Sequence, residues 1–328
     1  MTDVGRSFPR CARSMLAALL APLALGAAAQ DYPAKVVRIV VPFPAAGSTD
    51  AIARVLGQKL SQSLGQNFIV ENRPGATGTI AGALVAKSPP DGYTLILHST
   101  SSYIAPFVYS KPPYDGARAF TPVIRCVISG LALVSSTSLP AKNVKELVAL
   151  ARRRPNDLTF GTVGQGSVAH LAAEMFNAAA GVKTLAVTYK GAAPTLIALA
   201  SGEVGFSVLN LLDPQPFVKQ GKIRALAVTG AKRSLVLPDV PTLMESGVGV
   251  EAYLYQGLFA PAGAPAPIVG KLNAEITRII SEPQTMTWFN NNVGGEFAPH
   301  TPAQFGEFLS TDVAGWLKVV ARIGFKLD

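Results

Sequence analysis

Strand and helix patterns alternate from residue 36 to residue 97, and this alternation constrains the fold more than any other feature. Residues 36–41 read VVRIVV, a nearly continuous apolar run between two prolines, which is typical of a strand covered on both faces. The strand patterns lie at 36–41, 68–70 and 93–97, and helical patterns separate them at 52–64 and 79–87. This βαβαβ order predicts a parallel, doubly wound sheet with ligands at the carboxyl ends of its strands.

The same alternation returns in the middle of the chain and stops after residue 255. Strand patterns lie at 158–160, 186–189, 204–208 and 223–228, among helical patterns at 144–153, 167–179, 194–200 and 215–220. The last part carries helical patterns alone, at 268–280, 284–290 and 302–323. Two α/β units in series predict two lobes, of residues 30–130 plus 255–328 and of residues 131–254. The chain would then cross between the lobes twice, and such paired crossings allow a cleft to open and close.

The first 29 residues have the pattern of a secretory signal peptide. Three arginines precede the apolar run MLAALLAPLALGAAA, whose small residues fit a cleavage site before Gln30. The run is shorter than the roughly 20 residues that a bilayer span needs, and a retained anchor is the alternative. Export would leave a soluble mature chain and would remove Cys11. Because Cys126 would then be the sole cysteine, the mature chain could form no internal disulfide.

The positive charge and the histidines of the chain indicate neither a nucleic-acid site nor a metal site. The formal net charge is +9, but its densest run, residues 152–154, ends a helical pattern, where cations are favourable. His98, His170 and His300 lie far apart, without the spacing of metal ligands. We therefore expect no metal and no nucleic-acid partner. We also expect that the protein has no cofactor and is a monomer.

Two loops rich in small residues follow strand patterns and precede helical patterns. The first reads PFPAAGSTD, residues 42–50, and the second reads TVGQGS, residues 162–167. The first N–H groups of a helix have no intrahelical partner, and small residues let a ligand approach them closely. Two such loops, one in each lobe, could hold the two ends of a dicarboxylate without a cation. Neither is a nucleotide-binding fingerprint or a P-loop, and either alone could be a simple turn.

Longer motifs around these loops resemble one family of exported receptors. They are PFPAAGSTDAIAR (42–54), GQNFIVENRPGATGTIAG (65–82), SPPDGYTLIL (88–97), FGTVGQGSVAHLAAEMF (160–176), YKGAAPTLIALASGEV (189–204) and GKIRALAVTGAKRSLVLPDVPTLMESG (221–247). In this length and order they resemble the substrate-binding proteins of tripartite tricarboxylate transporters, the Bug family. The resemblance covers essentially the whole mature chain.

The resemblance implies a two-lobed periplasmic receptor, a Venus flytrap of the type II kind, that is not an enzyme. Its cleft would hold a small mono- or dicarboxylate through backbone amides and waters. It would deliver this ligand to an inner-membrane tripartite permease, or alternatively would serve a sensor. The resemblance places at the ligand Phe43, Ala45, Gly47, Ser48, Thr49, Asp50, Ser99, Thr100, Ser101, Thr162, Gly164, Gly166, Ser167, Lys190, Gly191 and Ala192.

Several of these residues also have simpler structural interpretations. Asp50 could be a first-turn acid of its helix, and Lys190 could remain in solvent. Ser167 could cap a helix, and His170 could pack or cap without touching ligand. A remote alternative function, an exported serine hydrolase, would pair Ser167 with His170. The sequence shows neither an orienting acid nor a G-x-S-x-G elbow for that reaction.

The chain also departs from the family pattern. Ala46, Thr77 and Ala81 stand where the family commonly has glycine, and Gly205 and Leu209 stand where it often has aspartate. If such an aspartate lies near the cleft, its loss removes a partner for a ligand amine. The departures at 205 and 209 therefore favour a carboxylate without an amino group over an amino acid.

Overall fold

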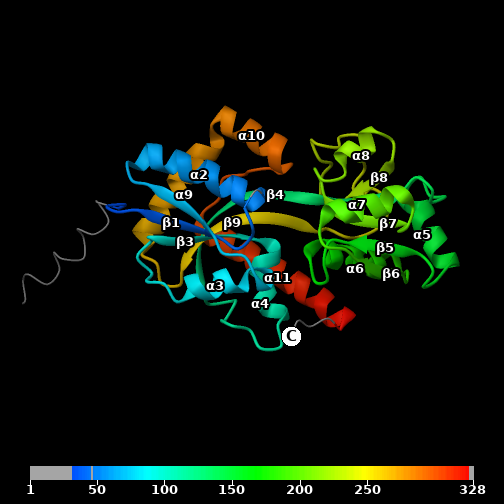
Figure 1. Cartoon of the computed structure of the whole chain (residues 1–328), viewed down its shortest axis with the longest axis horizontal. Helices are drawn as coiled ribbons and strands as arrows, with labels where there is room; N and C mark the ends of the chain where they lie inside the picture. Colours follow the sequence, from blue (N-terminus) through cyan, green and yellow to red (C-terminus); the bar gives the residue numbers. More distant parts are fainter. Residues whose placement is uncertain (1–31, 46, 325–328) are drawn as a thin grey trace, which may run out of the picture.

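The computed structural model describes residues 32–45 and 47–324, and Figure 1 shows them as two lobes connected by long strands. The predicted signal peptide, residues 1–29, lies outside the described residues, as does Ala46. The strands form one sheet in the order β2-β1-β3-β9-β4-β7-β5-β6, with β8 paired to β4. Within residues 32–45 and 47–324, no helix combines the length and the hydropathy that a membrane span requires.

The first lobe is built on three parallel strands, β2 (Phe68–Asn72), β1 (Val37–Val41) and β3 (Thr94–Ser99). Its first helices are α2 (Ser48–Leu64), the short 3₁₀ turn η1 (Ala76–Gly78), α3 (Thr79–Ala86) and α4 (Thr100–Val108). Ile52, Leu56 and Leu60 recur at helical spacing and therefore lie on one face of α2. This face is buried in one core with Ile39 of β1. Gly65 ends α2 in the left-handed conformation (φ 71°), at the residue where the sequence predicts the end of this helix. The strands and helices of this region follow one another in the predicted βαβαβ order.

The two lobes share the strands β4 (Phe120–Ser136) and β9 (Tyr253–Pro261), which run antiparallel to each other. Over residues 120–130 β4 pairs with β9, and over residues 131–136 it pairs with β7 and β8. Strand β9 also pairs with β3, so that Gln256 lies opposite Ser99. The sequence pattern predicts neither strand, because it indicates only helices after residue 255 and gives no boundary for a 17-residue strand.

The second lobe repeats the α/β plan of the first. Its strands are β5 (Thr159–Thr162), β6 (Leu185–Thr188), β7 (Phe206–Asn210) and β8 (Ile223–Val228), and β5 is parallel to both β6 and β7. Its helices are α5 (Val144–Arg153), α6 (Val168–Ala180), α7 (Ala192–Ser201) and α8 (Gln215–Lys219). The elements predicted in this region are confirmed, with small shifts at their ends. Phe160, Phe176 and Phe206 pack together in its core.

Three helices complete the chain. Helices α9 (Ala266–Ser281) and α10 (Pro283–Val293) pack near α2 on the first lobe. Helix α11 (Pro302–Ile323) contacts both lobes, as its course in Figure 1 shows. Phe305 and Leu309 pack with Tyr255 of the first lobe, whereas Trp316 and Val320 belong to the core of the second lobe. Helix α11 therefore bridges the two lobes.

Candidate ligand-binding site

A cavity of about 410 Å³ lies where the carboxyl ends of β1 and β3 meet strand β9 and the end of β7. Its lining residues are Phe43, Pro44, Ala45, Gly47, Ser48, Thr49, Ser99, Ser101, Asn210, Leu254 and Gln256. Asn210 belongs to the second lobe, so the cavity lies between the lobes. Because none of the described residues that line it has a charged side chain, an anion bound there would depend on neutral donors.

The first loop brings the start of α2 to this cavity. Gly47 is the N-cap residue, in an extended conformation (φ −82°, ψ 168°), and no described side chain caps the helix. Ser48 and Thr49 occupy the first turn, where N–H groups lack intrahelical partners. A helix start without a side-chain cap attracts anions through these amides and through the helix dipole.

Asp50 holds the first loop against the body of the lobe. Its side chain is buried, its Oδ2 accepts a hydrogen bond from Arg54 Nε (2.9 Å), and its Oδ1 accepts one from Asn72 Nδ2 (2.9 Å). Asn72 Nδ2 also donates to the carbonyl of Phe43 (3.1 Å), which ties the loop to the end of β2. Asp50 does not line the cavity, and these contacts agree with its interpretation as the first-turn acid of α2.

The end of β3 places Ser99 and Ser101 at the cavity and Thr100 away from it. Ser99 caps α4, because its Oγ accepts from the Ser102 amide while Ser102 Oγ accepts from the Ser99 amide (3.0 Å). Thr100 is fully buried, and its Oγ1 accepts from the Tyr255 amide (2.7 Å). Thr100 therefore fixes β9 against α4.

The second loop does not line the cavity, and several of its donors are engaged within the loop. Ser167 Oγ accepts from the His170 amide (3.2 Å) and so caps α6. The Gly166 amide donates to His170 Nδ1 (3.1 Å), and the Thr162 hydroxyl donates to the carbonyl of Gly164 (3.1 Å). Burial lowers the pKa of His170, which keeps Nδ1 available as an acceptor. His170 therefore organises the loop, in agreement with its structural interpretation.

The segment of Lys190, Gly191 and Ala192 also lies outside the cavity lining. Lys190 is exposed, and the Gly191 amide donates to the carbonyl of Val163 in the second loop (3.1 Å). Gly191 is the N-cap of α7 with φ 104°, in the region that favours glycine. This segment is therefore attached to the second loop and would move with it.

The departures from the family pattern occupy structural positions. Leu209 is fully buried in the second-lobe core, whereas its neighbour Asn210 lines the cavity. A Cβ on Gly205 would lie 2.6 Å from Leu158 Cδ1 and 3.2 Å from the carbonyl oxygen of Thr159, so a larger residue there would have to displace the Leu158 side chain. Because neither 205 nor 209 lines the cavity, the preference for a ligand without an amine loses its basis. Thr77 has φ 53°, in the left-handed region that favours the glycine of the family pattern.

Four lining residues are absent from the set predicted by sequence: Pro44, Asn210, Leu254 and Gln256. Pro44 lies between two predicted residues, so a wider window around that motif would include it. Asn210 lies just beyond a predicted strand, at the end where ligands are expected. Leu254 and Gln256 have no such signal, because strand β9 is not predicted.

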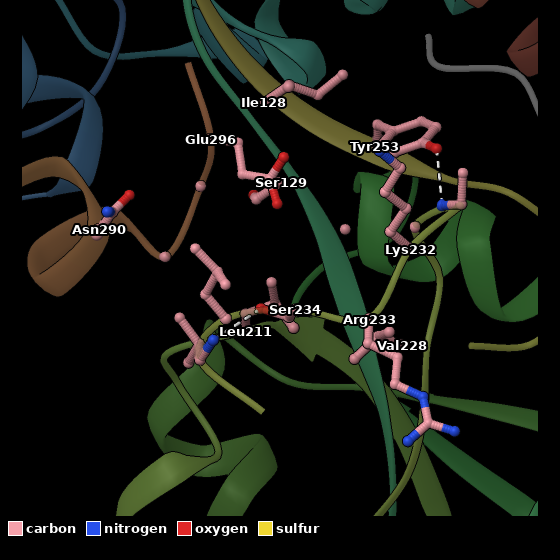
Figure 2. Close-up of a pocket in the computed structure, with 17 residues that line it drawn as sticks. Ile128, Ser129, Leu211, Val228, Lys232, Arg233, Ser234, Tyr253, Asn290 and Glu296 are labelled. Atoms are coloured by element: carbon pink, nitrogen blue, oxygen red, sulfur yellow. Dashed lines mark hydrogen bonds between the residues drawn. The ribbon is translucent and has the colours of Figure 1, made fainter. Parts of the chain in front are cut away.

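A smaller cavity of about 200 Å³ lies beside the shared strands (Figure 2). Figure 2 shows Asn290 and Glu296 on one side of it and Lys232 and Arg233 on the other. Arg233 points away from Glu296, and its Nε donates to Glu245 (3.0 Å). This cavity contains none of the predicted site residues and has charges of both signs, so it is the weaker candidate for binding an acid.

Comparison with known proteins identifies the family. A family model described as the tripartite tricarboxylate transporter family receptor matches residues 52–325. The chain belongs to this receptor family. Among its relatives, protein BugT of Bordetella pertussis is 34% identical over 310 residues, a match that covers 94% of this chain and 95% of BugT. The predicted resemblance to Bug proteins is therefore confirmed.

Solved structures of similar proteins have the same fold. An R. palustris protein solved with adipate is 37% identical (TM-score 0.78), and the match covers 90% of this chain and 99% of that one. MatC from Rhodopseudomonas palustris, with bound malate, is 31% identical (TM-score 0.74), with 88% and 100% covered. The periplasmic binding protein BugD is 32% identical (TM-score 0.74), with 90% and 99% covered. These likenesses confirm the predicted two-lobed α/β fold of a periplasmic binding protein.

Proposed function

We propose that this chain is a periplasmic solute-binding protein that captures a small mono- or dicarboxylate between its lobes and performs no reaction on it. The observation that carries this proposal is the cavity without charged side chains at the start of α2, where no described side chain caps the helix. Backbone amides and waters would bind the acid there. The helix dipole would add about 0.3–1 kcal/mol of binding free energy.

The relatives support a carboxylate as the ligand. Two similar proteins were solved with adipate and with malate, and both ligands are aliphatic dicarboxylates. We infer that one acid end binds at the first loop, with Asp50 and Thr100 supporting the site. The second-lobe set would reach the other end when the lobes close: Thr162, Gly164, Gly166, Ser167, Lys190, Gly191 and Ala192.

Closure would move each lobe as a unit, and we place the units at residues 30–130 plus 255–328 and at residues 131–254. The change of partners along β4, from β9 to β7 and β8 after residue 130, supports a hinge at that point. Helix α11 packs on both lobes, so it would shift against α6 as the cleft closes.

The closed, loaded form would deliver the ligand to an inner-membrane tripartite permease. The description of the family as a receptor of tripartite tricarboxylate transporters supports this partner. Residues 1–29 would export the chain to the periplasm, where it would act as a monomer. A sensor that binds the closed form is the alternative partner.

The serine hydrolase alternative receives no support from the second loop. Ser167 Oγ accepts a hydrogen bond from the backbone amide of His170, and His170 Nδ1 accepts one from the amide of Gly166. These interactions cap α6 and order the loop. A nucleophile would need its hydroxyl proton to be accepted by a base, which neither interaction provides.

A panel of aliphatic, aromatic and tricarboxylic acids tests the proposal by calorimetry and thermal shift. A ligand at about 100 times its Kd should add about 2.7 kcal/mol to the apparent free energy of unfolding. At one fixed concentration of each acid, the added stability should rise with the logarithm of its affinity. If no acid in the panel shifts the melt while an ester is hydrolysed, the binding function is wrong and the hydrolase alternative gains.

A further inference from the structure

Asp312 lies on α11 at the place where this helix passes from one lobe to the other. Leu309, one turn before it, packs in the first-lobe core, and Trp316, one turn after it, packs in the second-lobe core. The Oδ1 atom of Asp312 accepts a hydrogen bond from Trp316 Nε1 (3.1 Å). The Oδ2 atom is buried, and no described residue donates a hydrogen bond to it. A carboxyl group with one unsatisfied oxygen therefore occupies the junction between the lobes.

The first-lobe groups around Asp312 leave this oxygen unsatisfied. Tyr255 of β9 also has a buried hydroxyl that no described residue contacts by a hydrogen bond. Burial and the nearby charge of Asp312 raise the pKa of Tyr255 and of Tyr103 on α4. Arg125 of β4 attracts Asp312, but its guanidinium lies over the Phe308 ring, 4.5 Å from the ring centre. The arrangement of the lobes described here thus does not favour an ionised Asp312.

Burial is the main influence on the charge of Asp312. It raises the pKa of this carboxyl group to about 7, against the opposing effects of the Trp316 hydrogen bond and the Arg125 charge. Among the described residues, no charged group of α6 or α9, which also pack against α11, contributes to this shift. Glu174 of α6 faces a separate groove together with Lys318 of α11. Asp312 therefore gains or loses its charge near neutral pH.

Movement of the lobes would change the contacts of Asp312. The second loop does not line the cavity, so under the proposed function this arrangement is the open one. Closure would shift α11 against α6, and Trp316, which donates to Asp312, packs in the second-lobe core. An ionised carboxylate with a buried, unsatisfied oxygen is costly, whereas the protonated form carries no charge. Ionisation therefore destabilises the open arrangement relative to one in which Oδ2 gains a partner.

We propose that Asp312 couples lobe closure to protonation: its protonated form stabilises the open arrangement, and its ionised form favours the closed one. The inference rests on the proposed function, because closure over a ligand is part of that function. Coupling between two binding events is reciprocal, so ligand binding should release a proton from Asp312. Affinity for the ligand should then rise as the pH rises through neutrality.

The fluorescence of Trp316 tests the titration of Asp312 without any ligand. The chain has two tryptophans, so Trp288→Phe leaves Trp316, which donates to Asp312, as the sole tryptophan. We expect a transition in its emission near pH 7, and we expect Asp312→Asn in the same background to abolish it. Glu307→Gln changes an exposed acid of the same helix and should keep the transition. Constant emission between pH 6 and pH 8, or a transition that persists in Asp312→Asn, would overturn the inference.

Calorimetry with adipate and malate tests the coupling to closure. Both are aliphatic carboxylic acids, which stay ionised between pH 6 and pH 8, so their own protonation contributes little. If closure lowers the pKa of Asp312 by about one unit, affinity should rise about fivefold over this range in the parent protein. It should change less than about twofold in Asp312→Asn, and Glu307→Gln should behave as the parent protein does. Titration in buffers of different ionisation enthalpy should show proton release that Asp312→Asn lacks.

The results separate this inference from the proposed function. If no acid binds at any pH, the proposed function is wrong, and the coupling to a ligand is wrong with it. If an acid binds with the same pH dependence in the parent protein and in Asp312→Asn, the function stands and Asp312 does not couple protonation to closure. Asparagine is similar in size to aspartate and keeps the Oδ1 acceptor for Trp316, so the variant should fold.

Discussion

The two loops that follow β1 and β5 share a sequence pattern but differ in their hydrogen bonds. In the first loop, Gly47 precedes α2, and no described side chain caps that helix. In the second loop, Ser167 caps α6, and the Gly166 amide donates to His170 Nδ1. The first loop lines the cavity between the lobes, and the second does not. The first thus presents donors to a ligand, whereas the second uses donors to fix its own shape.

Small residues before a helix do not by themselves make an anion site. The deciding property is whether a side chain already satisfies the first amides of the helix. We infer that the first loop supplies most of the binding free energy for the acid. The second loop supplies a rigid surface that closes over the ligand. Variants that change one loop at a time can therefore show which loop binds the acid.

Gly47→Val should have the largest effect on binding. The φ of −82° suits any residue, and among the described residues a Cβ there would meet only the carbonyl of Pro44, at 3.9 Å, so the fold should persist. The valine methyl groups would crowd the start of α2 and reduce affinity for the acid at least about tenfold, or 1.4 kcal/mol. Calorimetry measures the affinity and chemical denaturation the stability. An unchanged affinity would place the ligand elsewhere.

Gly166→Val should affect the fold more than the binding. Its φ of 73° lies in the left-handed region, where a side chain costs about 1–2 kcal/mol. The free energy of unfolding should fall by that amount. The affinity of the folded fraction should fall less than in Gly47→Val. Denaturant titration and calorimetry on the same sample separate the two effects. A greater loss of affinity than in Gly47→Val would make the second loop the principal site.

Ser167→Ala should have a smaller effect, because it removes one helix cap. The expected loss in the free energy of unfolding is about 1 kcal/mol, with a mild loss of affinity. Asn143→Ala is the matched control, since Asn143 caps α5 in the same lobe by accepting from the Glu146 amide (2.9 Å). If Ser167→Ala weakened binding strongly while Asn143→Ala did not, the Ser167 hydroxyl would be a direct ligand contact.

The pH dependence of the second loop should be the smallest effect. Burial lowers the pKa of His170 below its usual 6.5, so the unfolded chain takes up a proton at a higher pH than the folded chain does. The stability contributed by neutral His170 is therefore present above pH 6.5 and is lost as pH falls below it. His170→Gln should reduce the slope of stability against pH between 6.5 and 5. The slope of stability against pH in His300→Gln serves for comparison, because burial also lowers the pKa of His300, which lies outside the second loop. An unchanged slope in His170→Gln would mean that its protonation does not affect the loop.

Local patterns predict much of the fold and only part of the site. Apolar runs and helical spacing indicate β1, α2 and α11, because each buries a face that its own residues specify. Strands β4 and β9 are not predicted from local patterns, because they form through pairing between distant segments, such as Ser99 with Gln256. The same long-range pairing brings Gln256 and Leu254 to the cavity. The hydrogen bond between Gly166 and His170 also needs three-dimensional structure, although both residues belong to a recognisable motif.

A structure of the complex with the tightest-binding acid of the panel would show whether backbone amides at the start of α2 hold the ligand. We predict a carboxylate oxygen within about 3 Å of the backbone nitrogen of Ser48 or Thr49, with no arginine or lysine side chain in contact with it. An acid held mainly by arginine or lysine, or bound in the cavity of Figure 2, would contradict the account.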